Sequence, residues 1–143
     1  MNKICEPIDL IAEFLPSGMD HAVKVAEYAT TGSMLELASY LGLDVNLLHS
    51  AATLHDFVED TGMFDRFEGI SKEVWSIVEI LTKKDDETYH EYLLRIKERF
   101  ENSYFGKYAY IIKLADMKDH LSRKETLTDK LKEKYIDGLA VLL

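Results

Sequence analysis

The sequence predicts an all-α fold, a compact single-domain bundle of several helices. Apolar residues recur at spacings of three and four along almost the whole chain, which is typical of helices with one buried face. No alternating run of apolar and polar residues is long enough to indicate a sheet, and only 7 glycines and 2 prolines interrupt the 143 residues. A chain of this length fits one domain, which we expect to cover residues 1–143.

Eight helices are expected, with ends that periodicity defines only to about two to four residues. They cover residues 5–15, 20–30, 33–42, 45–60, 71–83, 88–100, 104–123 and 128–142. The second helix has an apolar face of small residues, and the fourth follows one apolar stripe from Leu47 to Val58. These two helices are therefore expected to contribute to the core.

Polar residues at several expected helix starts can cap the free backbone N–H groups. Two pairs fit the capping box, in which a hydroxyl and a carboxylate satisfy these donors together: Ser33 with Glu36, and Thr88 with Glu91. The single N-cap residues are Asp44, Ser71 and Thr128. Gly42 suits the end of the third helix.

Composition and charge exclude several classes of function. The formal net charge is −9, from 26 acidic and 17 basic residues, which argues against a nucleic-acid polymer as partner. Cys5 is the single cysteine, so no intrachain disulfide can form. No stretch approaches the roughly 18 to 20 apolar residues of a membrane span, and the first residues lack the pattern of a signal peptide. We expect a cytoplasmic protein that acts on a small molecule, and the sequence leaves its oligomeric state open.

Residues 54–61 are the most informative segment, because a histidine and three carboxylates interrupt an apolar, helical pattern there. His55 lies on the apolar stripe and Asp56 follows it directly, so burying them costs free energy unless something pairs them. A divalent cation accepts neutral imidazole and carboxylate together. On one helix, Glu59 lies a turn beyond His55 and Asp60 a turn beyond Asp56, which makes a shell for a metal ion and its water. The alternative is that both carboxylates simply leave the helix toward solvent.

Two residues from distant parts of the chain can complete a metal site. His21 stands at the start of the apolar face of residues 22–29, and Asp116 lies in a similarly apolar segment. Each also has an ordinary interpretation. His21 can be a polar residue near a helix start, and Asp116 can pair with Lys113 or His120.

Taken in order, these residues resemble the metal-binding signature of the HD phosphohydrolase superfamily. The ligand positions are His21, His55, Asp56 and Asp116. Residues 55–61 are similar to the His-Asp-x-x-Glu-Asp-Thr element in the hydrolase domain of RelA/SpoT-type alarmone enzymes. The Leu-Thr-Lys, Tyr-x-x-Tyr and Lys-Leu-Ala-Asp landmarks of that family have counterparts at residues 81–83, 89–92 and 113–116. The resemblance spans residues 18 to 121 and implies an HD-type hydrolase domain without the synthetase domain of the bifunctional enzymes.

Three departures from the family pattern lie beside these landmarks. His120 stands where the alarmone hydrolases usually carry an asparagine that helps to hold the nucleotide, and Met117 stands where an arginine often follows the aspartate. Residues 18–21, Gly-Met-Asp-His, shorten the usual Gly-x-Pro-Tyr-x-x-His segment. We expect all three changes to lie on the substrate side of the pocket, so hydrolysis is better supported than guanosine tetraphosphate as its target.

The resemblance implies a metal-dependent enzyme that removes pyrophosphate from the 3′ position of a guanosine alarmone. It implies manganese, and ligands of nitrogen and oxygen also suit iron or zinc. Glu59 and Asp60 are expected to orient or deprotonate the attacking water. The residues expected to contact the nucleotide are Lys113, His120 and Lys24. His120 can instead hydrogen-bond Asp116 or lie on the surface.

Other functions stay open at this point. A sister enzyme that hydrolyses another nucleotide phosphate is favoured by Met117 and His120. A regulatory module that binds metal or nucleotide without turnover is compatible with the same two residues. A purely structural helical protein, which would bind no metal, is the least favoured interpretation.

Overall fold

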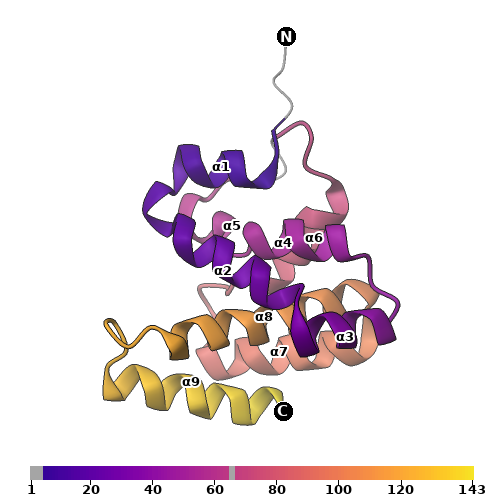
Figure 1. Cartoon of the computed structure of the whole chain (residues 1–143). Helices are drawn as coiled ribbons and strands as arrows, with labels where there is room; N and C mark the ends of the chain where they lie inside the picture. Colours follow the sequence, from indigo (N-terminus) through magenta and orange to yellow (C-terminus); the bar gives the residue numbers. More distant parts are fainter. Residues whose placement is uncertain (1–4, 65–66) are drawn as a thin grey trace.

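The longest helix, α8, runs through the middle of the molecule and has other helices packed on several sides (Figure 1). The computed structural model describes residues 5–64 and 67–143. In these residues the elements are α1 (Pro7–Phe14), the 3-10 helix η1 (Pro16–Gly18), α2 (Met19–Ala29), α3 (Gly32–Tyr40), α4 (Val45–Thr53), α5 (Phe57–Thr61), α6 (Lys72–Leu81), α7 (Tyr89–Asn102), α8 (Tyr104–Ser122) and α9 (Asp129–Leu142). The described part of the chain holds no strand, so the predicted all-α class is confirmed.

Helix α8 is buried around most of its circumference because α2, α6, α7 and α9 all pack against it. In Figure 1, α7 and α9 lie below α8, and α1, α4, α5 and α6 lie above it. Three ionisable residues of α8 are therefore buried among apolar neighbours, namely Lys113, Asp116 and Asp119. Such residues need partners inside the protein.

The predicted small-residue face of α2 is confirmed. Ala22, Val25, Ala26 and Ala29 are all buried. Their short side chains allow the backbone of α2 to lie close to both α4 and α8, which are its main packing partners. His21, in the first turn of α2, is brought toward α8 by this packing.

The prediction of one continuous helix over residues 45–60 is wrong at its middle. Helix α4 ends at Thr53, and residues 54–56 form a turn before α5. Nδ1 of His55 donates to the carbonyl of Ala52 at 2.8 Å, so a side chain takes a carbonyl that a continuing helix would use. Adjacent residues of a continuous helix point about 100° apart. The turn instead allows His55 and Asp56 to approach the same point.

Most of the predicted helix caps are present. The side chains that accept N–H bonds from the first turn of their helices are Asp44, Ser71, Thr88 and Thr128. The predicted capping box of Ser33 and Glu36 is wrong, because α3 begins earlier, with Thr31 as its N-cap. Gly32 has a φ of 58°, a left-handed conformation that turns the chain sharply and moves the start of the helix.

The connection between α6 and α7 is held by a side chain of α7. Arg95 donates to the carbonyls of Ile80 and Thr82 at 2.8 and 3.2 Å. It also forms an ion pair with Glu87 at 2.7 Å. These bonds satisfy carbonyls at the end of α6 and define the path of residues 82–88, which lead to the site.

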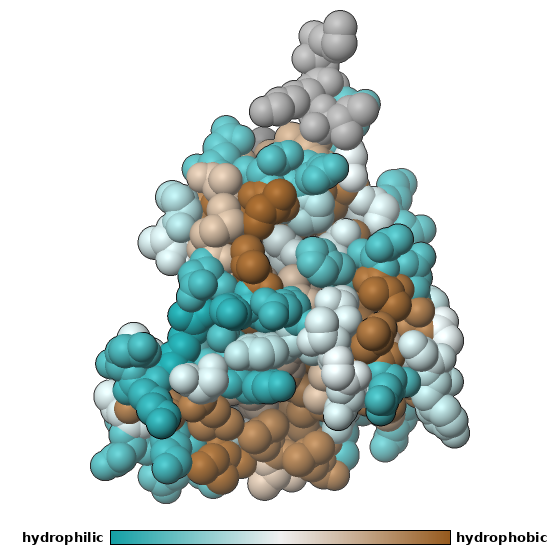
Figure 2. Space-filling view, in the orientation of Figure 1, coloured by the Kyte–Doolittle hydropathy of each residue, from teal (hydrophilic) through white to brown (hydrophobic). Residues whose placement is uncertain are grey.

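Figure 2 shows one face of the molecule. Hydrophilic side chains cover much of its middle, and hydrophobic side chains gather in its lower part, over α9. Ile136 of α9 and the terminal Leu143 are exposed hydrophobic residues. Among the described residues, none of the helices is both long and apolar enough to cross a lipid bilayer.

Candidate metal centre

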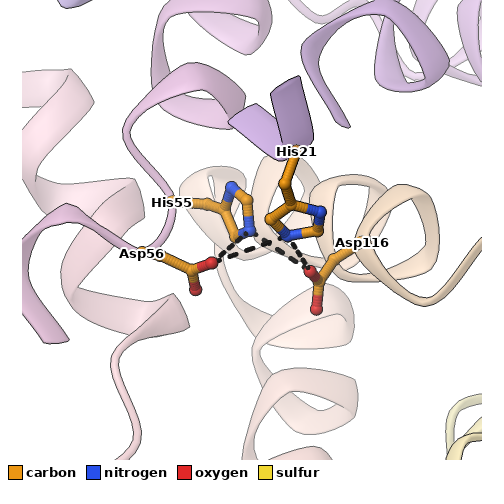
Figure 3. A group of neighbouring side chains, drawn as sticks. All are labelled: His21, His55, Asp56 and Asp116. Atoms are coloured by element: carbon orange, nitrogen blue, oxygen red, sulfur yellow. Dashed lines mark hydrogen bonds and ion pairs between the residues drawn. The ribbon is translucent and has the colours of Figure 1, made fainter. Parts of the chain in front are cut away.

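The four predicted metal ligands lie together where α2, the turn of residues 54–56 and α8 meet (Figure 3). Asp116 Oδ1 is 2.9 Å from Nε2 of His21 and 3.2 Å from Nε2 of His55. Asp56 Oδ2 is 3.0 Å from Nε2 of His55 and 3.6 Å from Nε2 of His21. All four donor atoms lie within 4.8 Å of one another. Ligand bonds of about 2.0–2.2 Å place opposite donors about 4 Å apart, so the group has the dimensions of a metal site.

Both histidine rings are oriented by their Nδ1 atoms. Nδ1 of His55 donates to the Ala52 carbonyl at 2.8 Å, and Nδ1 of His21 lies 2.5 Å from Oδ2 of Asp119. A hydrogen on Nδ1 leaves the lone pair of a neutral ring on Nε2, the atom that faces the group. Two imidazole nitrogens and two carboxylate oxygens are a donor set that fits a divalent cation such as manganese, iron or zinc.

A further layer of charged residues supports the ligands. Arg123 Nε donates to Asp119 Oδ2 at 2.6 Å, so Asp119 is held between Arg123 and His21. Lys113 Nζ donates to the second carboxylate oxygen of Asp116 at 2.8 Å. Asp116 and His21, two of the candidate ligands, thus each have a charged partner that helps to orient the side chain.

Burial differs across the group. The side chains of His55 and Asp116 are each 5% exposed, whereas that of Asp56 is 39% exposed. The group is therefore closed on the side of α8 and open to solvent at Asp56.

The buried charges shift the pKa values of the ligands. Burial lowers the pKa of His21, but its hydrogen bonds with Asp116 and Asp56 outweigh this effect and raise the pKa to about 9. Burial likewise opposes charge on His55, yet the neighbouring Asp56 and Asp116 raise its pKa well above the ordinary value. For Asp116, burial raises the pKa, but Lys113 and the histidines hold it well below the usual range. The metal-free group therefore carries ionised carboxylates and protonated imidazoles.

Two cavities adjoin the ligand group, the name used here for the candidate ligands His21, His55, Asp56 and Asp116. One, of about 170 Å³, has Asp60 in its wall, and the other, of about 200 Å³, has Glu59 in its wall. Asp56 lines both cavities. Burial first, and then the charge of Asp56, raises the pKa values of Glu59 and Asp60. The two carboxylates predicted to act on water thus adjoin the ligand group at different cavities.

Two of the three predicted substrate contacts, Lys113 and His120, line the larger of these cavities. His120 Nε2 lies 3.2 Å from Asp116 Oδ1, and its ring stacks on Tyr135 with centroids 4.7 Å apart and an interplanar angle of 6°. His120 therefore both contacts the candidate ligand Asp116 and faces the cavity. The alternative that His120 lies on the surface without contacting the site does not fit these contacts.

The third predicted contact, Lys24, is not brought to the site. Its ammonium lies 3.9 Å from Glu27, its side chain is 45% exposed, and it lines neither cavity. Met117 is also not where the sequence suggested, because its side chain is fully buried in the core. A Cβ added to Gly138 of α9 would lie 2.8 Å from Met117 Cε, so Met117 packs against α9. The expectation that Met117 lies on the substrate side is wrong.

Three residues at the site were not predicted. Asp119 lies three residues after Asp116, so the two share a face of α8, and that spacing is a signal that could have identified it. Lys134 and Tyr135 of α9 line the larger cavity. Nothing in the local pattern of α9 distinguishes them from residues of an ordinary solvated face.

Comparison with known proteins adds no relative. No protein-family model, no curated protein and no solved structure matches this chain. The functional interpretation therefore depends on the residues of the site and on their geometry.

Proposed function

We propose that this protein is a divalent-metal-dependent phosphohydrolase that acts on a small nucleotide phosphate. The observation that carries the proposal is the convergence of two histidines and two aspartates beside a cavity with three lysines in its wall. Donors for a cation and positive charge for an oxyanion are the two requirements of phosphoryl transfer, and here they adjoin each other.

The ligands in this proposal are His21, His55, Asp56 and Asp116. When bound, a divalent cation supplies Lewis acidity, which makes water more acidic and offsets negative charge on a phosphate oxygen. Glu59 accepts the proton of the attacking water, since its carboxylate shares a cavity with the lysines and its pKa is raised by burial. Asp60 orients water that approaches through the smaller cavity. Lys113 and His120 contact the phosphate end of the substrate.

The proposed substrate is a guanosine alarmone that loses its 3′ pyrophosphate, and the proposed metal is manganese. Both proposals rest on the resemblance of residues 55–61 and their companion landmarks to the alarmone hydrolases. A second candidate is the same reaction on another nucleotide phosphate. It is favoured by His120, whose ring is fixed between Asp116 and Tyr135 and differs in shape and hydrogen bonding from an asparagine.

The test is a screen of the purified protein with manganese against guanosine tetraphosphate and a panel of nucleotides, with phosphate and pyrophosphate detected separately. Asp56→Asn and His55→Ala are expected to lose bound metal and activity together. Glu59→Gln is expected to keep the metal and to lower kcat by roughly 10²- to 10⁴-fold. Glu98→Gln, an exposed change on α7, is the matched control.

Retention of full activity by all three site variants would exclude the mechanism. Saturable metal binding without release of phosphate or pyrophosphate from any nucleotide would favour the regulatory module instead. Hydrolysis of other nucleotides with guanosine tetraphosphate left intact would select the second candidate.

A further inference from the structure

Helix α9 closes the larger cavity beside the ligand group. Lys134 and Tyr135 of α9 face residues of α7 and α8 across this space of about 200 Å³. α9 packs against both of these helices, and its buried Gly138 lies close to Leu93, Met117 and Tyr89. Lys134 lies one turn before Gly138, and although it is an exposed residue, its side chain reaches the wall of the cavity.

The ammonium of Lys134 is held over aromatic rings at the cavity. Its Nζ lies 4.4 Å from the ring centroid of Tyr89 and 5.7 Å from that of Tyr135. These cation–π contacts favour a position at the cavity over one extended into solvent. Among the described residues, no carboxylate lies within ion-pairing distance of Lys134 or of Lys83, the second lysine in the wall. Lys113, the third, is already paired with Asp116.

The side chains in the wall of the cavity carry equal numbers of positive and negative formal charges. Its ammonium groups belong to Lys83, Lys113 and Lys134, and its carboxylates to Asp56, Glu59 and Asp116. Their formal charges cancel. A divalent cation on the ligand group would leave two positive charges in excess, which suits a dianion such as a phosphoryl group.

The size of the cavity limits what can enter it. Pockets that enclose a whole small-molecule ligand usually measure about 300–1,000 Å³, and this one is smaller. A phosphoryl end fits, while a sugar and base would remain outside. Among the described residues, the buried hydroxyl of Tyr89 has no hydrogen-bond partner, and Tyr89 lines the cavity. A buried donor without an acceptor costs free energy, and a phosphate oxygen is one acceptor that could satisfy it.

We propose that this cavity is the phosphate subsite of the enzyme, with Lys134 and Lys83 binding the non-bridging oxygens of the substrate. The inference rests on the proposed function and deepens it. In this inference Lys134 gives α9 a role in binding the negative charge of the substrate phosphate. The substrate class is then phosphate esters that enter the cavity by their charged end. Because the base stays outside, KM should vary little among nucleotides that present the same phosphate group.

The experiment measures binding of inorganic phosphate to the manganese-loaded protein by calorimetry at pH 7.5. Lys134→Ala is expected to weaken phosphate binding by about tenfold or more, because a charge-assisted contact is lost. Tyr89→Phe is expected to weaken it less. Lys132→Ala, an exposed change on the same helix, is the matched control and should leave phosphate binding unchanged. The affinity for manganese should stay the same in all three variants.

The results separate the subsite from the reaction. Equal phosphate affinity in the wild type, Lys134→Ala and Lys132→Ala would overturn the subsite, even if nucleotides are hydrolysed. Absence of phosphate binding by the manganese-loaded wild type would also overturn it. Phosphate binding that depends on Lys134 would support the subsite even if no nucleotide is hydrolysed, and the proposed hydrolase function would then fail alone.

Discussion

The histidines of the ligand group are held at their Nδ1 atoms by acceptors that lie outside the group. The Ala52 carbonyl accepts from His55, and the Asp119 carboxylate is the partner of His21. Both Nε2 atoms consequently face Asp116 without any further rearrangement of the rings. In the metal-free protein the same Nε2 atoms are within hydrogen-bonding distance of carboxylates, so protons occupy the positions that a cation would take.

We therefore expect metal affinity to rise with pH. The pKa of His21 is raised from 6.5 to about 9, so its ring is protonated in the metal-free protein at pH 7 and must lose that proton to bind a cation. Affinity for manganese should increase from pH 7 to 9, and the raised pKa of His55 should extend this rise to higher pH. Calorimetry at pH 7 in buffers with different heats of ionisation would measure the protons released. His49→Ala, at an exposed position, is the control. Affinity that stays constant from pH 7 to 9, with no proton release, would refute this expectation.

At the scale of the helices, the interruption between α4 and α5 is the feature that brings His55 and Asp56 together at the candidate site. Without it, His55 and Asp56 would point in directions about 100° apart and could not approach the same ion. The connection between α6 and α7 has a different role, because it carries Lys83 to the cavity wall. Arg95 holds this connection through Glu87 and two backbone carbonyls.

Replacement of Arg95 by Met should destabilise the protein by about 2–4 kcal/mol. The change leaves Glu87, whose side chain is only 13% exposed, and the carbonyls of Ile80 and Thr82 without their donor. Arg99→Met, one turn further along α7 at an exposed position, is the matched control. Urea unfolding of both variants measures the difference in free energy of unfolding. A difference below about 0.5 kcal/mol would show that the connection does not depend on Arg95.

On the scale of the whole molecule, the ligand group joins distant parts of the chain. His21 and Asp116 are 95 residues apart in sequence, and α2 and α8 carry them into contact. A cation bound to both would stabilise the folded state, because the unfolded chain does not hold these donors together.

Manganese at a hundred times its Kd should raise the free energy of unfolding by about 2.7 kcal/mol. For a chain of this size the midpoint of thermal unfolding should rise by roughly 5–10 °C. Asp116→Asn, which removes a ligand charge, should show no such metal-dependent rise even if its metal-free form is less stable. An equal rise in the wild type and in Asp116→Asn would place manganese elsewhere on the protein.

The features of the fold that could be predicted without coordinates are those that depend on neighbouring residues. Apolar spacing predicted the helices, and the side chains of Asp44, Ser71, Thr88 and Thr128 mark helix starts because a cap bonds to N–H groups two or three residues away. The order of His21, His55, Asp56 and Asp116, through its resemblance to the HD signature, also predicted the four residues that come together as a possible metal site.

The places where these side chains meet other elements became known only from the folded chain. It placed Glu59 and Asp60 at different cavities, put Met117 in the core and left Lys24 away from the site. It also brought Lys134 of α9 beside residues of α7 and α8. The physical reason is that periodicity and caps act within a few residues of the chain. The approach of one helix to another depends instead on the packing of side chains that lie far apart in sequence.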